Sequence, residues 1–421
     1  MTSPIASRKS WRAYFTGLWR QPDFLKLWAG QTISEFGSLL GALSLLAILT
    51  LNATPAQMGL LETLRSAPAL VMGLFAGVWV DRLRRRPLLI LADVGRFLLL
   101  ALVVLVAFLG VLRMETLYVA AFLVGCLTVL FNIAYHSFVP TLVKRDHLVE
   151  ANGKLGTTAS LAEITAPGVG GILVQLISAP MTLLLDAISF LASALFVARI
   201  QAPEPPVARL EQPPVWRDAV AGLRLVLAHP LLRATAASTA TWSFFGSFFG
   251  ALYGLYVLRE VGLSPVLLGV LIGSGGIGAL VGAMLVNRVT RRLGIGRTLI
   301  SALLFMGVVS VLVPLAAGFD KGIAAVLLLV SQMVGDVAVA IYLISELSLR
   351  QAVTPDEKLG RVNASFAFIV GGIGTLGLLT GGLLGQAVGL RPALAIAIAG
   401  TMLASLWLVF SPVRRLREVG V

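Results

Sequence analysis

The 421-residue sequence contains little charge, one cysteine and three histidines. Asp, Glu, Lys and Arg together make up only 13% of the residues, whereas 57% are hydrophobic. A water-soluble chain of this length needs a more polar surface, so the composition excludes an ordinary soluble domain. The single cysteine, Cys126, excludes an intramolecular disulfide framework and a thiolate metal cluster.

The chain also lacks a phosphate-binding loop of the form G-x-x-x-x-G-K-[ST] and a recognisable catalytic triad. We therefore expect neither ATP hydrolysis nor another enzymatic activity, and no cofactor. His136 has no second histidine or acidic pair nearby in the sequence, so we expect no metal site.

Long apolar runs dominate what is present. Each has roughly 20 residues, enough to cross ~30 Å of hydrocarbon. Within lipid every backbone polar group must be satisfied inside the segment, so such runs become helices. The sequence predicts an all-α membrane protein with twelve transmembrane helices. They lie at about 26–51, 57–80, 88–111, 115–139, 153–177, 180–200, 232–257, 264–286, 297–317, 322–347, 362–388 and 391–411.

The net charge of +13 reflects orientation in the membrane. Of the 33 Lys and Arg residues, 27 lie near the chain ends or in every second loop. The alternate loops hold only Arg113, Arg259, Lys321 and Arg391. The positive-inside rule then places both termini in the cytoplasm. We expect a monomer embedded in the lipid bilayer of the plasma (cell inner) membrane, with no nucleic-acid partner.

The longest loop, residues 201–231, is rich in proline and separates six predicted spans from six. We predict five regions. They are an N-terminal interfacial segment (1–25), a six-helix bundle (26–200), a cytoplasmic linker (201–231), a second six-helix bundle (232–411) and a cytoplasmic tail (412–421).

Two repeated tracts indicate an internal duplication. The tract GVWVDRLRRR (77–86) recurs as AMLVNRVTRR (283–292), 206 residues later. The tract at 137–152 corresponds to 348–363 at an offset of 211, which also places Gly170-Gly171 on Gly381-Gly382. Both halves have an even number of spans, so they run in the same sense and enclose a cavity near the midplane.

The pattern Gly77-xxx-Asp81-Arg82-xx-Arg85-Arg86, together with the twelve spans, resembles motif A of the major facilitator superfamily. The resemblance covers essentially the whole chain and implies two six-helix bundles related by a pseudo-twofold axis. It also implies a gate in which Asp81 caps a helix of the other half near Asn363. The second copy has Asn287 in place of the acid, so the first copy should dominate. The expected gate residues are Gly77, Asp81, Arg82, Arg85, Arg86, Asp93, Arg96 and Asn363. A simple basic turn is the alternative.

The fifth predicted span contains Ala162-xxx-Ala166-Pro167-xx-Gly170-Gly171. This segment resembles the superfamily's antiporter motif, G-x-x-x-G-P-x-x-G-G, which marks exporters. A face of small residues that packs against another helix is the alternative. The runs Leu91–Arg96 and Leu185–Phe190 resemble the macrolide-efflux and enterobactin-exporter branch, whose members include drug:proton antiporters. The fourth span has no arginine, so the proton-linked motif of many drug antiporters is missing from it.

Three acidic residues lie deep within predicted spans: Glu35, Glu163 and Asp336. Because burial disfavours the charged form of a carboxylic acid, such groups can exchange protons near neutral pH. Glu35 is the first candidate for proton coupling, and Gln31 shares its helix face. The alternative is that Glu35 contacts the substrate without coupling.

The seventh predicted span carries aromatic residues on one broad face, at spacings of three and four. They are Trp242, Phe245, Phe249, Tyr253 and Tyr256. Such a face can stack on a bulky, partly apolar ligand, although the same residues could face lipid. The polar residues expected to join them in a substrate cavity are Gln31, Asn132, Tyr135, His136 and Gln332. Glu62 and Arg65, three residues apart, are expected to form a local ion pair.

These features predict a secondary active transporter that exports a bulky, amphipathic, drug-like small molecule by alternating access, in exchange for protons. Other functions stay open. They are a lysophospholipid flippase, a siderophore or metal exporter of the same fold, and a non-transporting membrane receptor or scaffold.

Overall fold

The computed structural model describes residues 17–73, 83–204 and 215–417. In these ranges, eleven helical segments are long and apolar enough to cross a membrane, and they match eleven of the predicted spans. The twelfth, predicted at 57–80, begins as α3 (Pro55–Gly73) and continues outside the described residues. The all-α membrane fold predicted from the sequence is therefore confirmed.

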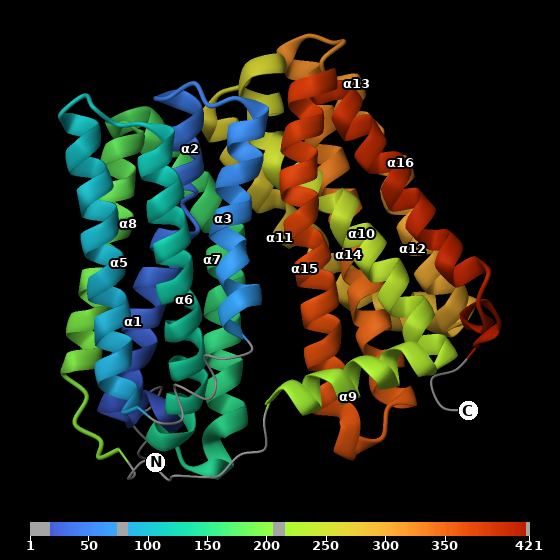
Figure 1. Cartoon of the computed structure of the whole chain (residues 1–421), viewed down its shortest axis with the longest axis horizontal. Coiled ribbons are helices and arrows are strands. Elements are labelled where there is room, and N and C mark those ends of the chain that lie inside the picture. The colour runs from blue at the N-terminus through green and yellow to red at the C-terminus, as the bar shows by residue number, and fades with distance from the viewer. Residues whose placement is uncertain (1–16, 74–82, 205–214, 418–421) are drawn as a thin grey trace, which may run out of the picture.

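The helices form two groups that stand side by side (Figure 1). The first half contains α1 (Pro22–Ser38), α2 (Ala42–Leu49), α3, α5 (Arg85–Phe108), α6 (Met114–Leu142), α7 (Leu148–Ile177) and α8 (Ala179–Ala198). The second half contains α10 (Pro230–Leu255), α11 (Pro265–Leu293), α12 (Ile295–Ser310), α13 (Leu312–Ala316), α14 (Lys321–Val353), α15 (Asp356–Val388) and α16 (Leu390–Val409). We call the end at which the described chain begins (Gly17) and ends (Arg417) the basic end, and the opposite end the far end (Figure 1).

The segment predicted as a linker contains a helix, α9 (Val215–Ala228), which lies at the basic end (Figure 1). It packs closely on α15 at Gly222. A methyl group added there would lie only 2.5 Å from the Arg361 carbonyl oxygen. Val226 of α9 is fully buried in a cluster that includes Phe366. At the other terminus, a short 3₁₀ helix, η2 (Gly17–Arg20), buries Leu18. Most of the aromatic segment before it lies outside the described residues.

The two glycine pairs related by the 211-residue offset make equivalent contacts. On α7, a methyl group at Gly170 would lie 2.1 Å from the Leu40 carbonyl oxygen of the same half. One at Gly171 would lie 2.2 Å from the Pro265 carbonyl oxygen of the other half. On α15, Gly381 faces Phe248 of its own half, and Gly382 faces Gly59 of the other half. Each pair thus fixes one contact within a half and one contact between halves, as expected for a duplicated chain.

The first span is interrupted between α1 and α2. Gly41 has φ +68°, a left-handed conformation that favours glycine, and it separates the two helices. Leu40, in the break, is the residue that contacts Gly170. The interruption therefore lies against the antiporter-like segment of α7.

Candidate functional site

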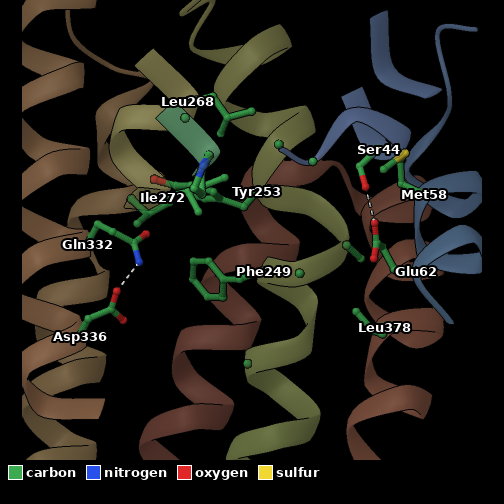
Figure 2. A pocket seen from close by; sticks show the side chains of 18 of the residues that line it. Ser44, Met58, Glu62, Phe249, Tyr253, Leu268, Ile272, Gln332, Asp336 and Leu378 are labelled. Atoms are coloured by element: carbon green, nitrogen blue, oxygen red, sulfur yellow. Dashed lines mark hydrogen bonds between the residues drawn. The ribbon is translucent and has the colours of Figure 1, made fainter. Parts of the chain in front are cut away.

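A cavity of about 610 Å³ lies between the two halves. The first half contributes residues from α2 and α3 and from the break after α1, whereas the second half contributes most of the remaining wall. Figure 2 shows side chains of both halves projecting into this space. Its size suits a drug-sized organic ligand.

One wall is aromatic and comes from α10. Trp242, Phe249 and Tyr253 line the cavity, and the rings of Phe249 and Tyr253 have centroids 6.4 Å apart. Phe245, predicted to join them, instead packs on α16, where a methyl group at Gly400 would lie 2.1 Å from its ring. Tyr256 is also directed elsewhere, since its hydroxyl donates to the Val313 carbonyl at 2.6 Å.

The first half supplies a neutralised pair of charges to the cavity. Glu62 and Arg65 form the predicted ion pair, with Arg65 Nη2 2.8 Å from Glu62 Oε2. Ser44 of α2 donates a further hydrogen bond to Glu62 Oε1 at 2.6 Å (Figure 2). Every oxygen of this carboxylate therefore has a partner, and the pair contributes no net charge to the cavity.

The second half supplies an acid without a cation. Gln332 Nε2 donates to Asp336 Oδ2 at 2.6 Å, one turn apart on α14 (Figure 2). Gly275 of α11 makes room for this carboxylate, because a methyl group there would lie 2.0 Å from Asp336 Oδ2. Among the described residues that line the cavity, the acidic and basic ones are Glu62, Arg65 and Asp336, and Asp336 is the acid that has no basic partner among them.

The other predicted acids, Glu35 and Glu163, lie in the first half and are not among the residues that line the cavity. Glu35 of α1 lies within electrostatic range of Glu163 on α7 and of Gln31. Tyr135 of α6 is within range of the same carboxylate, and its ring stacks on Phe131. The structure therefore gathers Gln31, Glu35, Tyr135 and Glu163 from three helices into one polar group, separate from Asp336.

The remaining predicted polar residues of this region are Asn132 and His136. They lie four residues apart on α6, so they share one face, and both side chains are exposed. The His136 ring contacts the Tyr135 ring edge-on at 5.5 Å between centroids. Neither residue lines the 610 Å³ cavity.

The Asp93–Arg96 pair, predicted to belong to the gate, lies in the interior of the first half. Asp93 is 0% exposed and Arg96 is 4% exposed, and they form an ion pair. The Arg96 guanidinium lies between the rings of Phe131 and Phe190, 4.4 and 4.2 Å from their centroids. Asp186 of α8 is within electrostatic range of the same guanidinium. The pair thus joins α5, α6 and α8, and it makes no described contact with Asn363.

Of the remaining residues predicted to form a gate, Gly77, Asp81 and Arg82 lie outside the described residues. The backbone N–H groups of Arg85 and Arg86 donate to the Glu204 carboxylate at 2.7 and 2.9 Å. This acid caps the positive N-terminal end of α5 and fixes the start of the linker to the first half. Asn363 lies on α15, and its buried Oδ1 atom has no hydrogen-bond partner among the described residues.

The two halves meet at the far end. Arg259, just after α10, donates from Nη1 to the Ala53 carbonyl at 2.7 Å and from Nη2 to the Ile48 carbonyl at 2.8 Å. Both acceptors belong to the first half, at the end of α2. Further along α3, Thr63 and Ser66 approach Thr375 of α15. In the sequence, Arg259 is recognisable only as a residue that indicates orientation in the membrane. Its contact with the first half could not be predicted, because its partners are backbone atoms 206 and 211 residues away.

A search of protein families matches the Major Facilitator Superfamily to residues 27–345. An uncharacterised transporter of this type from Bacillus subtilis, YfiS, is 26% identical over 407 residues, covering 92% of each chain. The multidrug efflux pump Tap of Mycolicibacterium fortuitum is 26% identical over 386 residues, covering 88% of this chain and 90% of Tap. Macrolide efflux protein A of Streptococcus pyogenes is 24% identical over 182 residues, covering 43% of this chain and 45% of its own.

Solved structures share the fold. A bacterial homologue of the iron transporter ferroportin in an inward-facing state has a TM-score of 0.74 at 18% identity, covering 94% of this chain and 99% of its own. The same homologue in an outward-facing state has a TM-score of 0.55 at 19% identity, covering 92% and 98%. The nucleoside transporter NupG has a TM-score of 0.71 at 15% identity, covering 93% of this chain and 98% of its own.

Proposed function

The chain belongs to the major facilitator superfamily of membrane transporters, and we propose that it exports a bulky, amphipathic organic cation in exchange for protons. The observation that carries this proposal is the cavity, which combines an aromatic wall with an acid, Asp336, that has no cationic partner there. An aromatic face attracts both apolar surface and positive charge. The efflux relatives support transport out of the cell.

Alternating access follows from where the halves touch. The α7–α11 and α3–α15 glycine contacts and the Arg259 hydrogen bonds all lie towards the far end. The greater similarity to the inward-facing ferroportin homologue agrees with this arrangement. We place the basic end, with both termini, in the cytoplasm of a plasma-membrane protein that acts as a monomer. The substrate then enters from the basic end while the far end is closed.

Proton coupling is assigned first to Glu35, with Glu163 as its partner acid. The two carboxylates interact across α1 and α7, and α7 also carries the contact between halves at Gly171. A proton on this pair therefore changes the charge next to a helix that moves when the halves separate. Asp336 has a different part, because it can hold either a proton or the cationic group of the substrate, but not both.

The test uses purified full-length protein in proteoliposomes with an imposed pH gradient and tetraphenylphosphonium as the probe cation. Asp336→Asn should lose most probe binding, whereas Glu35→Gln should retain binding and lose transport driven by the gradient. Gln332→Glu, which adds an acid beside Asp336, is the matched variant and should retain binding. Unchanged transport in Glu35→Gln would remove this residue from the coupling mechanism.

The other candidates give different outcomes in the same vesicles. A flippase would move a fluorescent lysophospholipid between leaflets without a pH gradient, and Asp336→Asn would leave that movement intact. A siderophore or metal exporter would carry its cargo but not the organic cation. A receptor or scaffold would show no movement of any probe.

A further inference from the structure

A second cavity, of about 570 Å³, lies at the basic end of the second half, outside the transport pathway. Four arginines line it, from the start of α12 and from the chain after α16: Arg297, Arg414, Arg415 and Arg417. The other lining residues are apolar: Leu293, Ile300, Val409 and Leu416. We call this site the arginine pocket.

Within residues 17–73, 83–204 and 215–417, nothing compensates the charges of the arginine pocket. All four arginines are exposed, and none forms an ion pair or a side-chain hydrogen bond within the described part of the chain. No acidic residue is among the lining residues. Four guanidinium groups around one small space repel one another, and an anion held between them relieves that repulsion.

The pocket is held in place by the backbone. The N–H groups of Ile295 and Gly296, at the start of α12, donate to the carbonyls of Arg417 and Leu416. Val413, in the short helix η5 (Pro412–Arg415), is fully buried. A methyl group at Gly296 would lie 1.9 Å from the Val413 carbonyl oxygen, so this approach is close. The arginines therefore stand on a fixed turn rather than on a free tail.

The pocket lies where a lipid-facing surface ends. Figure 1 shows α16 along the side of the second half that faces away from the first half. Apolar side chains of α12 and α16 are exposed along these helices, among them Phe305, Val308, Leu403, Trp407 and Phe410. Phe410 lies two residues before the start of η5 and is 82% exposed. An acyl chain against these residues brings its headgroup to the arginines.

We propose that the arginine pocket binds the headgroup phosphate of an anionic phospholipid from the leaflet at the basic end. Guanidinium groups bind phosphate oxygens through paired N–H donors, and several of them can share one phosphate diester. Basic pockets between membrane helices recognise anionic headgroups in this way. The apolar flank selects a lipid over a free anion of the same charge.

The test measures lipid retained by the full-length protein during native mass spectrometry in detergent, after titration with phosphatidylglycerol or phosphatidylcholine. The parent protein should retain phosphatidylglycerol at least ten times more tightly than phosphatidylcholine. Arg414→Gln/Arg415→Gln should lower the affinity for phosphatidylglycerol about tenfold or more. The matched control is Arg291→Gln/Arg292→Gln, which removes the same charge from the basic end of α11 without touching the pocket. It should bind like the parent.

Three results would overturn the proposal. One is equal affinity of the parent for the two lipids. Another is an equal loss in the control variant, which would indicate a general attraction to the basic end. The third is full displacement of the lipid by inorganic phosphate at equal concentration, which would indicate a site for free anions. An unfolding temperature measured on each variant in the same detergent separates lost binding from lost structure.

Discussion

Removing Arg259 should open the far end of the transporter. Its guanidinium makes two hydrogen bonds to the other half, one of 2.8 Å to the Ile48 carbonyl in the last turn of α2 and one of 2.7 Å to the Ala53 carbonyl in the turn that follows. The acceptor turn is rigid: Asn52 has φ +51°, the Ala53 N–H donates to the Ala47 carbonyl, and Thr54 and Gln57 cap the start of α3 reciprocally. The last carbonyls of a helix have no partner within it, so a cation from the other half stabilises this closed end.

The size of the effect follows from the geometry. A hydrogen bond to a charged group contributes about 1.5–3 kcal/mol, and the lower value suits a side chain that is partly exposed to solvent. Two such bonds favour closure by about 3 kcal/mol, or about 100-fold in the equilibrium between closed and open far ends. A minor open state populated at about 0.1–1% would rise to about 10–50% in Arg259→Gln.

Spin-label distances measure this shift. In a Cys126→Ala background, labels at Val111 and Phe319 report on the far end, since these exposed residues lie in turns of opposite halves. Arg259→Gln should add a longer distance to this pair. Arg391→Gln is the control, because Arg391 interacts with Glu260 of its own half. A distance distribution identical to that of the parent would refute the idea that Arg259 holds the halves together.

Three further substitutions, one of them with a rescue variant, test contacts in the cavity, inside the first half and between the halves. Gly275→Ala should weaken tetraphenylphosphonium binding about tenfold, measured by equilibrium binding, because its methyl group displaces the Asp336 carboxylate; unchanged affinity would argue against Asp336 as the cation site. Arg96→Met should destabilise the protein by about 3–5 kcal/mol, measured by denaturation in detergent, because it leaves Asp93 buried without a counter-ion. Adding Asp93→Asn should recover much of that loss, whereas no recovery would place the cost in ring packing instead. Gly382→Leu should wedge α15 from α3 and lengthen the far-end distance, and a closed far end in this variant would contradict the contact.

Much of the fold can be predicted because the membrane imposes it. A long apolar run has few alternatives to a helix in lipid, so transmembrane helices can be predicted from a single sequence. The glycine repeat is also predictable from the sequence. The 211-residue offset pairs Gly170-Gly171 with Gly381-Gly382, and the two pairs make equivalent contacts in the structure. Helix α9 is not predicted because the prolines around it favour a linker, although Val226 and its neighbours form an apolar face.

The sequence predicts which types of residue line the cavity better than it predicts which individual side chains face it. The spacing of three residues places Phe245 near the helix face of Trp242. At 3.6 residues per turn, however, the Phe245 side chain is rotated by about 60° around the helix axis from that of Trp242. That rotation turns it towards α16. Similarly, the Glu62–Arg65 pair is visible as spacing, whereas its position in the cavity depends on how α3 lies against the second half. Contacts between distant helices are not encoded in local periodicity.

The two halves share equivalent glycine contacts but contribute unequal chemistry, and this inequality bears on mechanism. The first half holds the Glu35–Glu163 acids together with a neutralised pair in the cavity. The second half holds the aromatic wall and the one cavity acid without a cation, within the described residues. The glycine contacts are equivalent in the two halves, so they do not distinguish one half from the other. In the proposed mechanism protonation acts on the first half and cation binding acts on the second, so the unequal acids bias the equilibrium between the two states of the transporter. We therefore propose that coupling depends on both halves, and that neither Glu35 nor Asp336 alone accounts for exchange.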